Sequence, residues 1–166
     1  FRSLGKPTYL GRGDKFANLY SYLTCKYVYE NFEDDYPDKR PLLLTRSAFA
    51  GQQSFGAVTW SGDVNGDWSS FRKQLAAGLN FTMSGIPYWT TDIGGFFRNA
   101  MFAPYDLPHA EKQYNSKEYR ELLIRWFQFG TFCPIQRIHG YQSDTEIWRF
   151  GNEVESILID HINLRY

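Results

Sequence analysis

The chain has little that would support metal or cofactor chemistry. Its two cysteines, Cys25 and Cys133, are far apart and show no metal-ligand spacing, so we expect two buried free thiols. Its three histidines, His109, His139 and His161, are scattered, and no two of them have the spacing of a helical metal site. No glycine-rich, phosphate-binding loop follows a strand-like segment. The sequence therefore predicts neither a metal site nor a nucleotide cofactor, and we expect the protein to need no cofactor.

The chain also lacks an excess of charge and long apolar runs. Its 18 basic and 18 acidic residues balance, and no basic cluster occurs, which argues against a nucleic-acid partner. No run reaches the roughly 18 apolar residues of a membrane span, so we expect no membrane segment. No signal peptide is visible in these residues. The compartment is not determined; we guess a periplasmic or extracellular location, with the cytoplasm as the alternative.

Aromatic side chains, in contrast, are abundant, at 19% of the 166 residues. Aromatic rings provide flat apolar walls for sugars, nucleobases or protein partners. Two stretches, residues 59–63 and 84–96, combine aromatics, glycine and a single aspartate at the end of an apolar run. This pattern predicts buried strands that end in a cleft, where carboxylate chemistry acts on a neutral, hydroxyl-rich ligand.

The spacing of apolar residues predicts short strands that alternate with helices. We expect strands at residues 42–45, 57–60, 79–83 and 132–138. We expect helices at residues 15–30, from residue 68 after an Asp67 cap, at 117–130 after a capping box, and at 152–166. The first helix is expected to bury five side chains: Phe16, Leu19, Tyr20, Leu23 and Tyr27. The alternation indicates an α/β fold built from parallel βα units.

Polar residues follow these predicted strands at the point where each strand enters its loop. They are Arg46, Asp63, Asp92 and His139. In a (β/α)₈ barrel this edge carries the active site. Four units make only half of such a barrel, so we expect residues 1–166 to form one domain, a fragment of a (β/α)₈ TIM barrel, within a longer protein.

Several motifs occur in a fixed order along nearly the whole chain. They are residues 18–20 (Asn-Leu-Tyr), 46–51 (Arg-Ser-Ala-Phe-Ala-Gly), 60–63 (Trp-Ser-Gly-Asp), 92–96 (Asp-Ile-Gly-Gly-Phe), 125–128 (Arg-Trp-Phe-Gln), 134–139 (Pro-Ile-Gln-Arg-Ile-His) and 164–166 (Leu-Arg-Tyr). This series resembles glycoside hydrolase family 31, the retaining α-glycosidases. The central motifs are most similar to those of the family's α-xylosidases.

The resemblance implies that the chain is the second half of the catalytic barrel, about strands 5 to 8 with their helices. It makes Asp63 the general acid/base; the plainer alternative is a turn residue. The family's nucleophile is an aspartate in a Trp-x-Asp-x-x-Glu-type motif after strand four, and these residues contain no such motif. The expected partners are therefore an oligosaccharide substrate and the remaining, nucleophile-bearing half of the barrel.

The resemblance also implies substrate-binding roles, each with a plainer alternative. Arg46 faces the sugar and pairs with acidic groups; the alternative is a structural ion pair. Asp92 supports the site or binds a sugar hydroxyl; the alternative is turn hydrogen bonding. His139 binds a sugar hydroxyl, with Arg137 in support, although a lone histidine is more often structural. Two aromatic residues complete the expected site as platforms for the sugar ring: Trp60 and Phe96.

From these residues we expect a retaining α-glycosidase that hydrolyses terminal, non-reducing α-linked xylose by double displacement. Xyloglucan oligosaccharides are the substrates expected by analogy. An α-glucosidase of the same family is one alternative. A catalytically incomplete carbohydrate-binding fragment is the other, because this chain alone lacks a nucleophile and is expected to be inactive.

Overall fold

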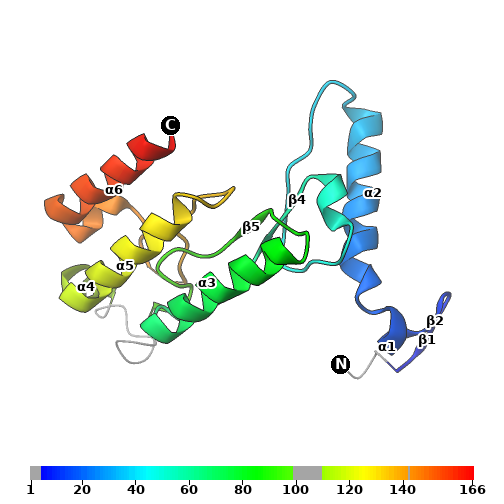
Figure 1. Cartoon of the computed structure of the whole chain (residues 1–166), viewed down its shortest axis with the longest axis horizontal. Coiled ribbons are helices and arrows are strands. Elements are labelled where there is room, and N and C mark those ends of the chain that lie inside the picture. The colour runs from blue at the N-terminus through cyan, green and yellow to red at the C-terminus, as the bar shows by residue number, and fades with distance from the viewer. Residues whose placement is uncertain (1–4, 99–109, 142) are drawn as a thin grey trace.

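The computed structural model describes residues 5–98, 110–141 and 143–166, with the side chains of 110–112 left aside. His109 and the middle of the long loop expected after the third strand lie outside the described residues. Three parallel strands form the central sheet, and helices pack along it, so that the chain extends from α2 at one end to α6 at the other (Figure 1). This arrangement confirms the predicted fold class, a partial α/β barrel with parallel strands.

The sheet has the order β3-β4-β5. The strands are β3 (Leu43–Thr45), β4 (Ala57–Trp60) and β5 (Trp89–Thr90). Leu44 is paired with Val58, and Trp60 with Thr90, so the carboxyl ends of the strands meet at one edge. The strands predicted at 42–45 and 57–60 are confirmed.

The strand predicted at residues 79–83 is wrong. These residues form the last turns of α3 (Trp68–Met83), and the third strand is β5, six residues further on. A short apolar run fits a buried strand and a helix equally well. The helix forms because Asp67 caps it: the Asp67 side chain accepts a hydrogen bond of 2.7 Å from the Ser70 amide.

The strand predicted at residues 132–138 is reduced to one isolated bridge, between Ile93 and Ile138. The segment still lies beside β5, because the Thr90 hydroxyl donates to the Ile135 carbonyl at 2.6 Å. Pro134 has no amide proton to donate, which interrupts regular pairing here. The segment therefore occupies the place of a fourth strand beside β5, but it does not form a regular strand.

The core lies between the last two long helices, α5 (Lys117–Gly130) and α6 (Asn152–Arg165). Ser116 caps α5 by accepting a hydrogen bond from the Tyr119 amide at 3.2 Å. The inward face predicted for α5 is confirmed, because its members are almost fully buried: Tyr119, Leu122, Leu123, Trp126 and Phe127. The short helices α4 (Ala110–Asn115) and η4 (Ile147–Phe150) complete this end of the molecule.

At the other end, the first predicted helix differs from its expected position and face. A hairpin of β1 (Pro7–Thr8) and β2 (Gly11–Arg12) leads into α1 (Gly13–Phe16), and α2 runs from Leu19 to Asp35. The buried residues of α2 are Ser21 and Cys25, whereas Tyr20 is 76% exposed. The helix η1 (Gln52–Phe55) packs on α2, where Tyr22 and Phe55 meet edge to face.

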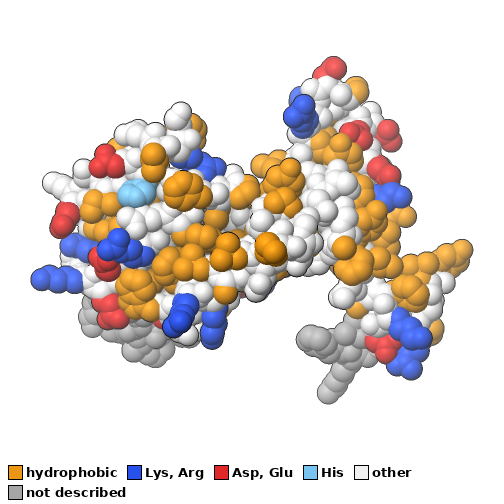
Figure 2. All heavy atoms as spheres, in the orientation of Figure 1, with side chains coloured by type: hydrophobic (Ala, Val, Ile, Leu, Met, Phe, Trp, Pro, Cys, Tyr) orange, Lys and Arg blue, Asp and Glu red, His pale blue; other side chains and the backbone are white. Residues whose placement is uncertain are grey.

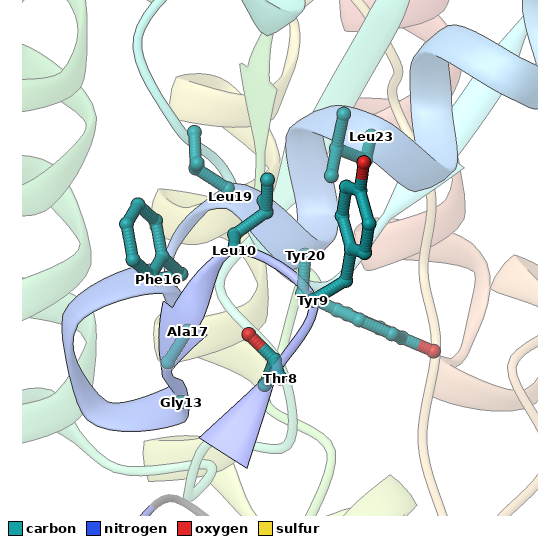
Figure 3. Close-up of a pocket in the computed structure, with 9 residues that line it drawn as sticks. All are labelled: Thr8, Tyr9, Leu10, Gly13, Phe16, Ala17, Leu19, Tyr20 and Leu23. Atoms are coloured by element: carbon teal, nitrogen blue, oxygen red, sulfur yellow. The ribbon is translucent and has the colours of Figure 1, made fainter.

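The predicted apolar face of α2 instead lines an open pocket of about 580 Å³ under the hairpin (Figure 3). The lining includes Leu10, Phe16, Leu19, Tyr20 and Leu23, and it carries no charged side chain. Hydrophobic side chains also reach the surface over α2 and the hairpin in the space-filling view (Figure 2). The face was predicted correctly as apolar, but no residue described here covers it.

The described part of the chain contains no helix that is both long and apolar enough to cross a membrane.

Two glycines allow the loops that follow β4 and β5 to touch backbone to backbone. A Cβ atom added to Gly95 would lie 2.2 Å from the Cα atom of Gly66, a separation that no side chain tolerates. Gly95 also has a φ of +82°, which favours glycine. The two loops therefore form one packed unit at the carboxyl edge of the sheet.

We expect Gly95→Ala to destabilise the full-length protein strongly. The positive φ alone costs about 1–2 kcal/mol, and relieving the overlap with Gly66 adds about 1–3 kcal/mol or more. Gly85→Ala is the matched control, because Gly85 has a φ of +79° and no neighbour within 4 Å of an added Cβ. Thermal unfolding should show the larger loss for Gly95→Ala; equal losses would mean that the loops can separate at no cost.

Candidate functional site

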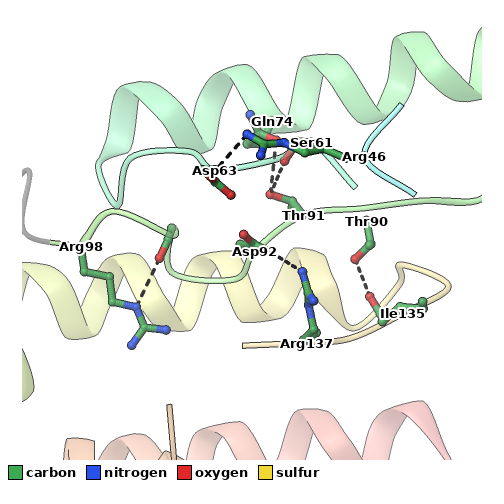
Figure 4. A network of polar contacts seen from close by, with 11 residues as sticks. Arg46, Ser61, Asp63, Gln74, Thr90, Thr91, Asp92, Arg98, Ile135 and Arg137 are labelled. Atoms are coloured by element: carbon green, nitrogen blue, oxygen red, sulfur yellow. Dashed lines mark hydrogen bonds and ion pairs between the residues drawn. The ribbon is translucent and has the colours of Figure 1, made fainter. Parts of the chain in front are cut away.

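The carboxyl edge of the sheet collects polar side chains from neighbouring strands (Figure 4). Arg46 directly follows β3, Asp63 comes three residues after β4, and Asp92 comes two residues after β5. Arg137 stands beside this edge because the Ile93 amide donates to its carbonyl at 3.2 Å. Parallel pairing therefore brings together residues that are up to 91 positions apart, between Arg46 and Arg137.

Asp63 and Arg46 form an ion pair that is open to solvent. The Arg46 Nη2 and Asp63 Oδ2 atoms are 3.3 Å apart, and their side chains are 60% and 30% exposed. Gly62 makes room for the arginine, since a Cβ added there would lie 2.9 Å from Arg46 Nε. The arrangement leaves the Asp63 carboxylate accessible to solvent.

Asp92 and Arg137 form a different kind of pair, buried and short. The Arg137 Nη2 atom donates to Asp92 Oδ1 at 2.5 Å, and the Asp92 side chain is fully buried. Burial raises the pKa of Asp92, while the charges of Arg137 and His139 lower it and that of Asp63 raises it. Arg137 thus holds Asp92 in place, and the charges of His139 and Asp63 also change the pKa of Asp92.

Three buried polar atoms around this pair have no hydrogen-bond partner among the described residues. They are Asp92 Oδ2, Arg137 Nε and the indole Nε1 of Trp60. The Arg137 guanidinium lies over the Trp60 ring, 5.7 Å from its centroid. Buried polar atoms in folded proteins are usually paired. These three atoms are exceptions to that rule, and they lie together at the carboxyl edge of the sheet.

Aromatic rings border the same edge. The rings of Phe96 and His139 are 5.3 Å apart, and Tyr141 adds a third ring 5.7 Å from Phe96. The seven residues singled out by the sequence thus fall into three contacting groups: Arg46 with Asp63, Trp60 with Arg137 and Asp92, and Phe96 with His139. Of the remaining four tryptophans, Trp89 and Trp126 are buried in the core, whereas Trp68 is 40% and Trp148 64% exposed.

Sequence reasoning missed a hydrogen-bonded chain beneath these groups. The Ser61 hydroxyl donates to Thr91 Oγ1, and Thr91 donates to Gln74 Oε1, each at 3.3 Å. Gln74 is a polar residue on the buried face of α3, between Phe71 and Gly78. That interruption of an apolar face was the available signal. These two hydrogen bonds link the ends of β4 and β5 to α3 behind them.

It also missed Arg98, a fully buried arginine in the loop after β5. Arginine is rarely buried so completely, but nothing in the sequence around it indicates that its guanidinium would be enclosed. Within the ranges that the structure describes, no group of three or more metal-ligating side chains was found.

The whole described chain has relatives of known family. Residues 5–166 match the family model for the glycosyl hydrolases family 31 TIM-barrel domain. An alpha-xylosidase of Saccharolobus solfataricus is 46% identical over 157 residues, which are 95% of this chain and 20% of that protein. Alpha-glucosidase 2 of Bacillus thermoamyloliquefaciens is 33% identical over 152 residues, 90% of this chain and 17% of the relative.

Solved structures agree with these sequence relatives. A GH31 alpha-xylosidase from a soil metagenome, complexed with xylose, superposes with a TM-score of 0.79 at 34% identity, over 99% of this chain and 26% of that one. A GH31 dextranase of Flavobacterium johnsoniae, complexed with glucose, gives 0.80 at 33% identity, over 99% of this chain and 19% of that one. The chain thus spans about a quarter or less of the proteins that it matches.

Proposed function

Because this chain belongs to glycoside hydrolase family 31 and is α-xylosidase-like, we propose that the whole protein hydrolyses terminal, non-reducing α-linked xylose with retention. Xyloglucan oligosaccharides are the proposed substrates. One observation carries the proposal: an accessible carboxylate, Asp63, stands beside buried polar atoms that have no hydrogen-bond partner in the described part of the chain.

In the proposed reaction, Asp63 acts twice. It first donates a proton to the glycosidic oxygen as the bond to the sugar breaks, and a nucleophilic carboxylate takes up the anomeric carbon. It then removes a proton from the water that releases the xylose. Arg46, 3.3 Å from Asp63, orients the carboxylate between these steps. The nucleophile is proposed to lie outside these residues.

The side chains with unpaired hydrogen-bonding atoms bind the sugar in this proposal. Asp92 Oδ2 accepts, and Arg137 Nε and Trp60 Nε1 donate, so together they suit hydroxyl groups, which both donate and accept. Phe96 and His139 border the ring of the sugar, the first as an apolar wall and the second as a hydrogen-bond partner. A neutral sugar needs no net charge beside its hydroxyl groups, and the buried Asp92–Arg137 pair carries none.

We further propose that residues 1–166 are the second half of the catalytic barrel and require the first half as a partner. The open pocket on α2 supports this, because its lining is apolar, carries no charged side chain and is covered by no described residue. The three-stranded sheet also has two edges, which a closed barrel would not have. The fragment alone is proposed to be inactive.

An α-glucosidase is the second candidate, since alpha-glucosidase 2 of B. thermoamyloliquefaciens is similar over 90% of this chain. Glucose differs from xylose by the hydroxymethyl group at C5. Such a group changes selectivity by only about 1–3 kcal/mol unless the pocket adds a clash. The choice between the two sugars is therefore an experimental one.

The full-length protein should cleave p-nitrophenyl α-xyloside with a higher kcat/KM than p-nitrophenyl α-glucoside. Proton NMR during hydrolysis should show α-xylose before mutarotation, because double displacement retains configuration. A preference for glucoside would replace xylosidase by glucosidase. Binding of xylose without any hydrolysis would instead support the carbohydrate-binding alternative.

A further inference from the structure

We propose that Arg98 is a positioning residue for the sugar site, because its buried guanidinium joins the loop that carries Phe96 to the loop that carries His139. The inference rests on the proposed function, in which these two rings border the sugar. It concerns a residue that touches neither the substrate nor the reacting atoms.

Arg98 is fully buried, and its charge is balanced in an unusual way. Among the described residues no carboxylate forms an ion pair with it. Its Nε atom donates to the Gly95 carbonyl at 3.3 Å, and its Nη1 atom donates to the Asp144 carbonyl at 3.1 Å. The guanidinium lies 5.8 Å from the centroid of the Tyr119 ring on α5. A buried charge that no described carboxylate neutralises is a poor source of stability. The contribution that these contacts support is therefore geometric, through the two carbonyls that the guanidinium joins.

The two carbonyls belong to different loops. Gly95 precedes Phe96 in the loop after β5, and Asp144 lies five residues beyond His139. The rigid fork of an arginine fixes the distance between two acceptors better than a flexible ammonium does. Arg98 therefore sets the separation between these loops at a point where neither is part of a strand.

Gly140, next to His139, leaves the space that this guanidinium occupies. A Cβ atom added to Gly140 would lie 2.6 Å from Arg98 Nε and 2.8 Å from Cζ. Gly140 is not among the glycines with positive φ, so the glycine is needed for space and not for its backbone angles. The loop that carries His139 thus passes directly against the buried charge.

Backbone and ring contacts also connect the two loops that Arg98 joins, close to the sugar site. The Tyr141 amide donates to the Phe96 carbonyl at 2.8 Å, and the Phe96 and His139 rings are 5.3 Å apart. Loss of the Arg98 bonds would let the loops separate and would change the position of both rings. Arg46 would be less affected, since it lies after β3 on the far side of β4.

The test uses the full-length protein and two arginine variants. Arg98→Met removes the fork but keeps much of the side-chain volume. Arg165→Met is the matched control: Arg165 also donates to backbone carbonyls, those of Thr131, Cys133 and Pro134, but from α6 and away from the site. For each protein we would measure Tm, kcat and KM for p-nitrophenyl α-xyloside, and the inhibition constant of free xylose.

We expect Arg98→Met to raise KM and the xylose inhibition constant by about tenfold, the size of one lost hydrogen bond to the sugar. Its kcat should fall less, because Asp63 keeps its Arg46 partner. Arg165→Met should lower Tm without changing either binding measure. If Arg98→Met does not fold, Gly140→Ala provides the same test, since it displaces the guanidinium without removing it.

Unchanged KM and xylose inhibition in folded Arg98→Met or Gly140→Ala would overturn the inference and leave the proposed function intact. Equal effects of the Arg98 and Arg165 variants on binding would also overturn it, by showing a general loss of packing. A wild-type protein that neither cleaves xyloside nor binds xylose would overturn the proposed function, and this inference with it.

Discussion

Asp63→Ala in the full-length protein is expected to lower kcat/KM for a xylosyl oligosaccharide by about 10²–10⁴, the usual contribution of a general acid/base. The loss should be smaller for p-nitrophenyl α-xyloside, because p-nitrophenolate leaves without a proton. The second step remains slow with both substrates, since no base activates the water. A steady-state comparison of the two leaving groups measures this difference.

Azide distinguishes the role of Asp63 from that of a nucleophile. An acid/base variant still forms the glycosyl-enzyme, and azide attacks it without a base, which gives α-xylosyl azide. A β-xylosyl azide would mean that Asp63 is itself the nucleophile. Asp67→Ala is the control: that carboxylate caps α3, so its loss should cost about 1 kcal/mol of stability and leave the rates unchanged. Full activity of Asp63→Ala would remove Asp63 from the mechanism.

Arg137→Leu is expected to destabilise the full-length protein by about 3 kcal/mol at neutral pH, the lower end for breaking a buried ion pair. The lower end applies because the Arg137 side chain is 30% exposed, while that of Asp92 is fully buried. The substitution leaves the Asp92 carboxylate buried without its charged partner. Chemical denaturation of the two proteins measures the difference.

The loss of stability caused by Arg137→Leu should become smaller as the pH falls. Burial raises the pKa of Asp92 above its unfolded value of 3.8, and the loss of Arg137, which lowers it, raises it further. Between the unfolded and the folded pKa the native state binds more protons than the unfolded state. The stability that this proton provides is present at low pH and is lost as the pH rises through the folded pKa. The variant should therefore approach the wild type in mildly acid solution.

Two comparisons test this explanation. Asp92→Asn with Arg137→Leu should be more stable at neutral pH than Arg137→Leu alone, because the unpaired charge at position 92 is removed. Arg12→Leu breaks an ion pair with the same 2.5 Å separation, but its partners are 67% and 42% exposed, so we expect a change below about 1 kcal/mol. A pH-independent deficit in Arg137→Leu would show that lost packing, and not the unpaired charge, is the cause.

Most of the fold could be predicted where the sequence carries a complete local signal. The helix α5 has its cap at Ser116, its apolar face and its terminal Gly130, and it was predicted at 117–130. Residues 79–83 have no such signal: the apolar run is short, and the Asp67 cap that commits it to a helix lies 12 positions earlier. The segment at 132–138 was placed beside the sheet, but Pro134 and the Thr90 side-chain bond replace regular strand pairing.

Four residues of the candidate site, Arg46, Asp63, Asp92 and His139, could be expected to gather because each follows a predicted strand. Parallel pairing then brings them to one edge without further information. Arg98 and Gln74 have no such position. Gln74 acts from a helix behind the sheet, and Arg98 depends on a loop 46 residues away, at Asp144. Contacts of that kind are determined by tertiary packing.

The contact between Gly66 and Gly95 has a consequence for anyone who wishes to redesign this protein. Each loop occupies the volume that a side chain on the other would need. A loop taken from a relative therefore cannot replace one of the two independently of the other. Residues 61–67 and 92–98 form one packed unit, so both loops would have to come from the same donor enzyme.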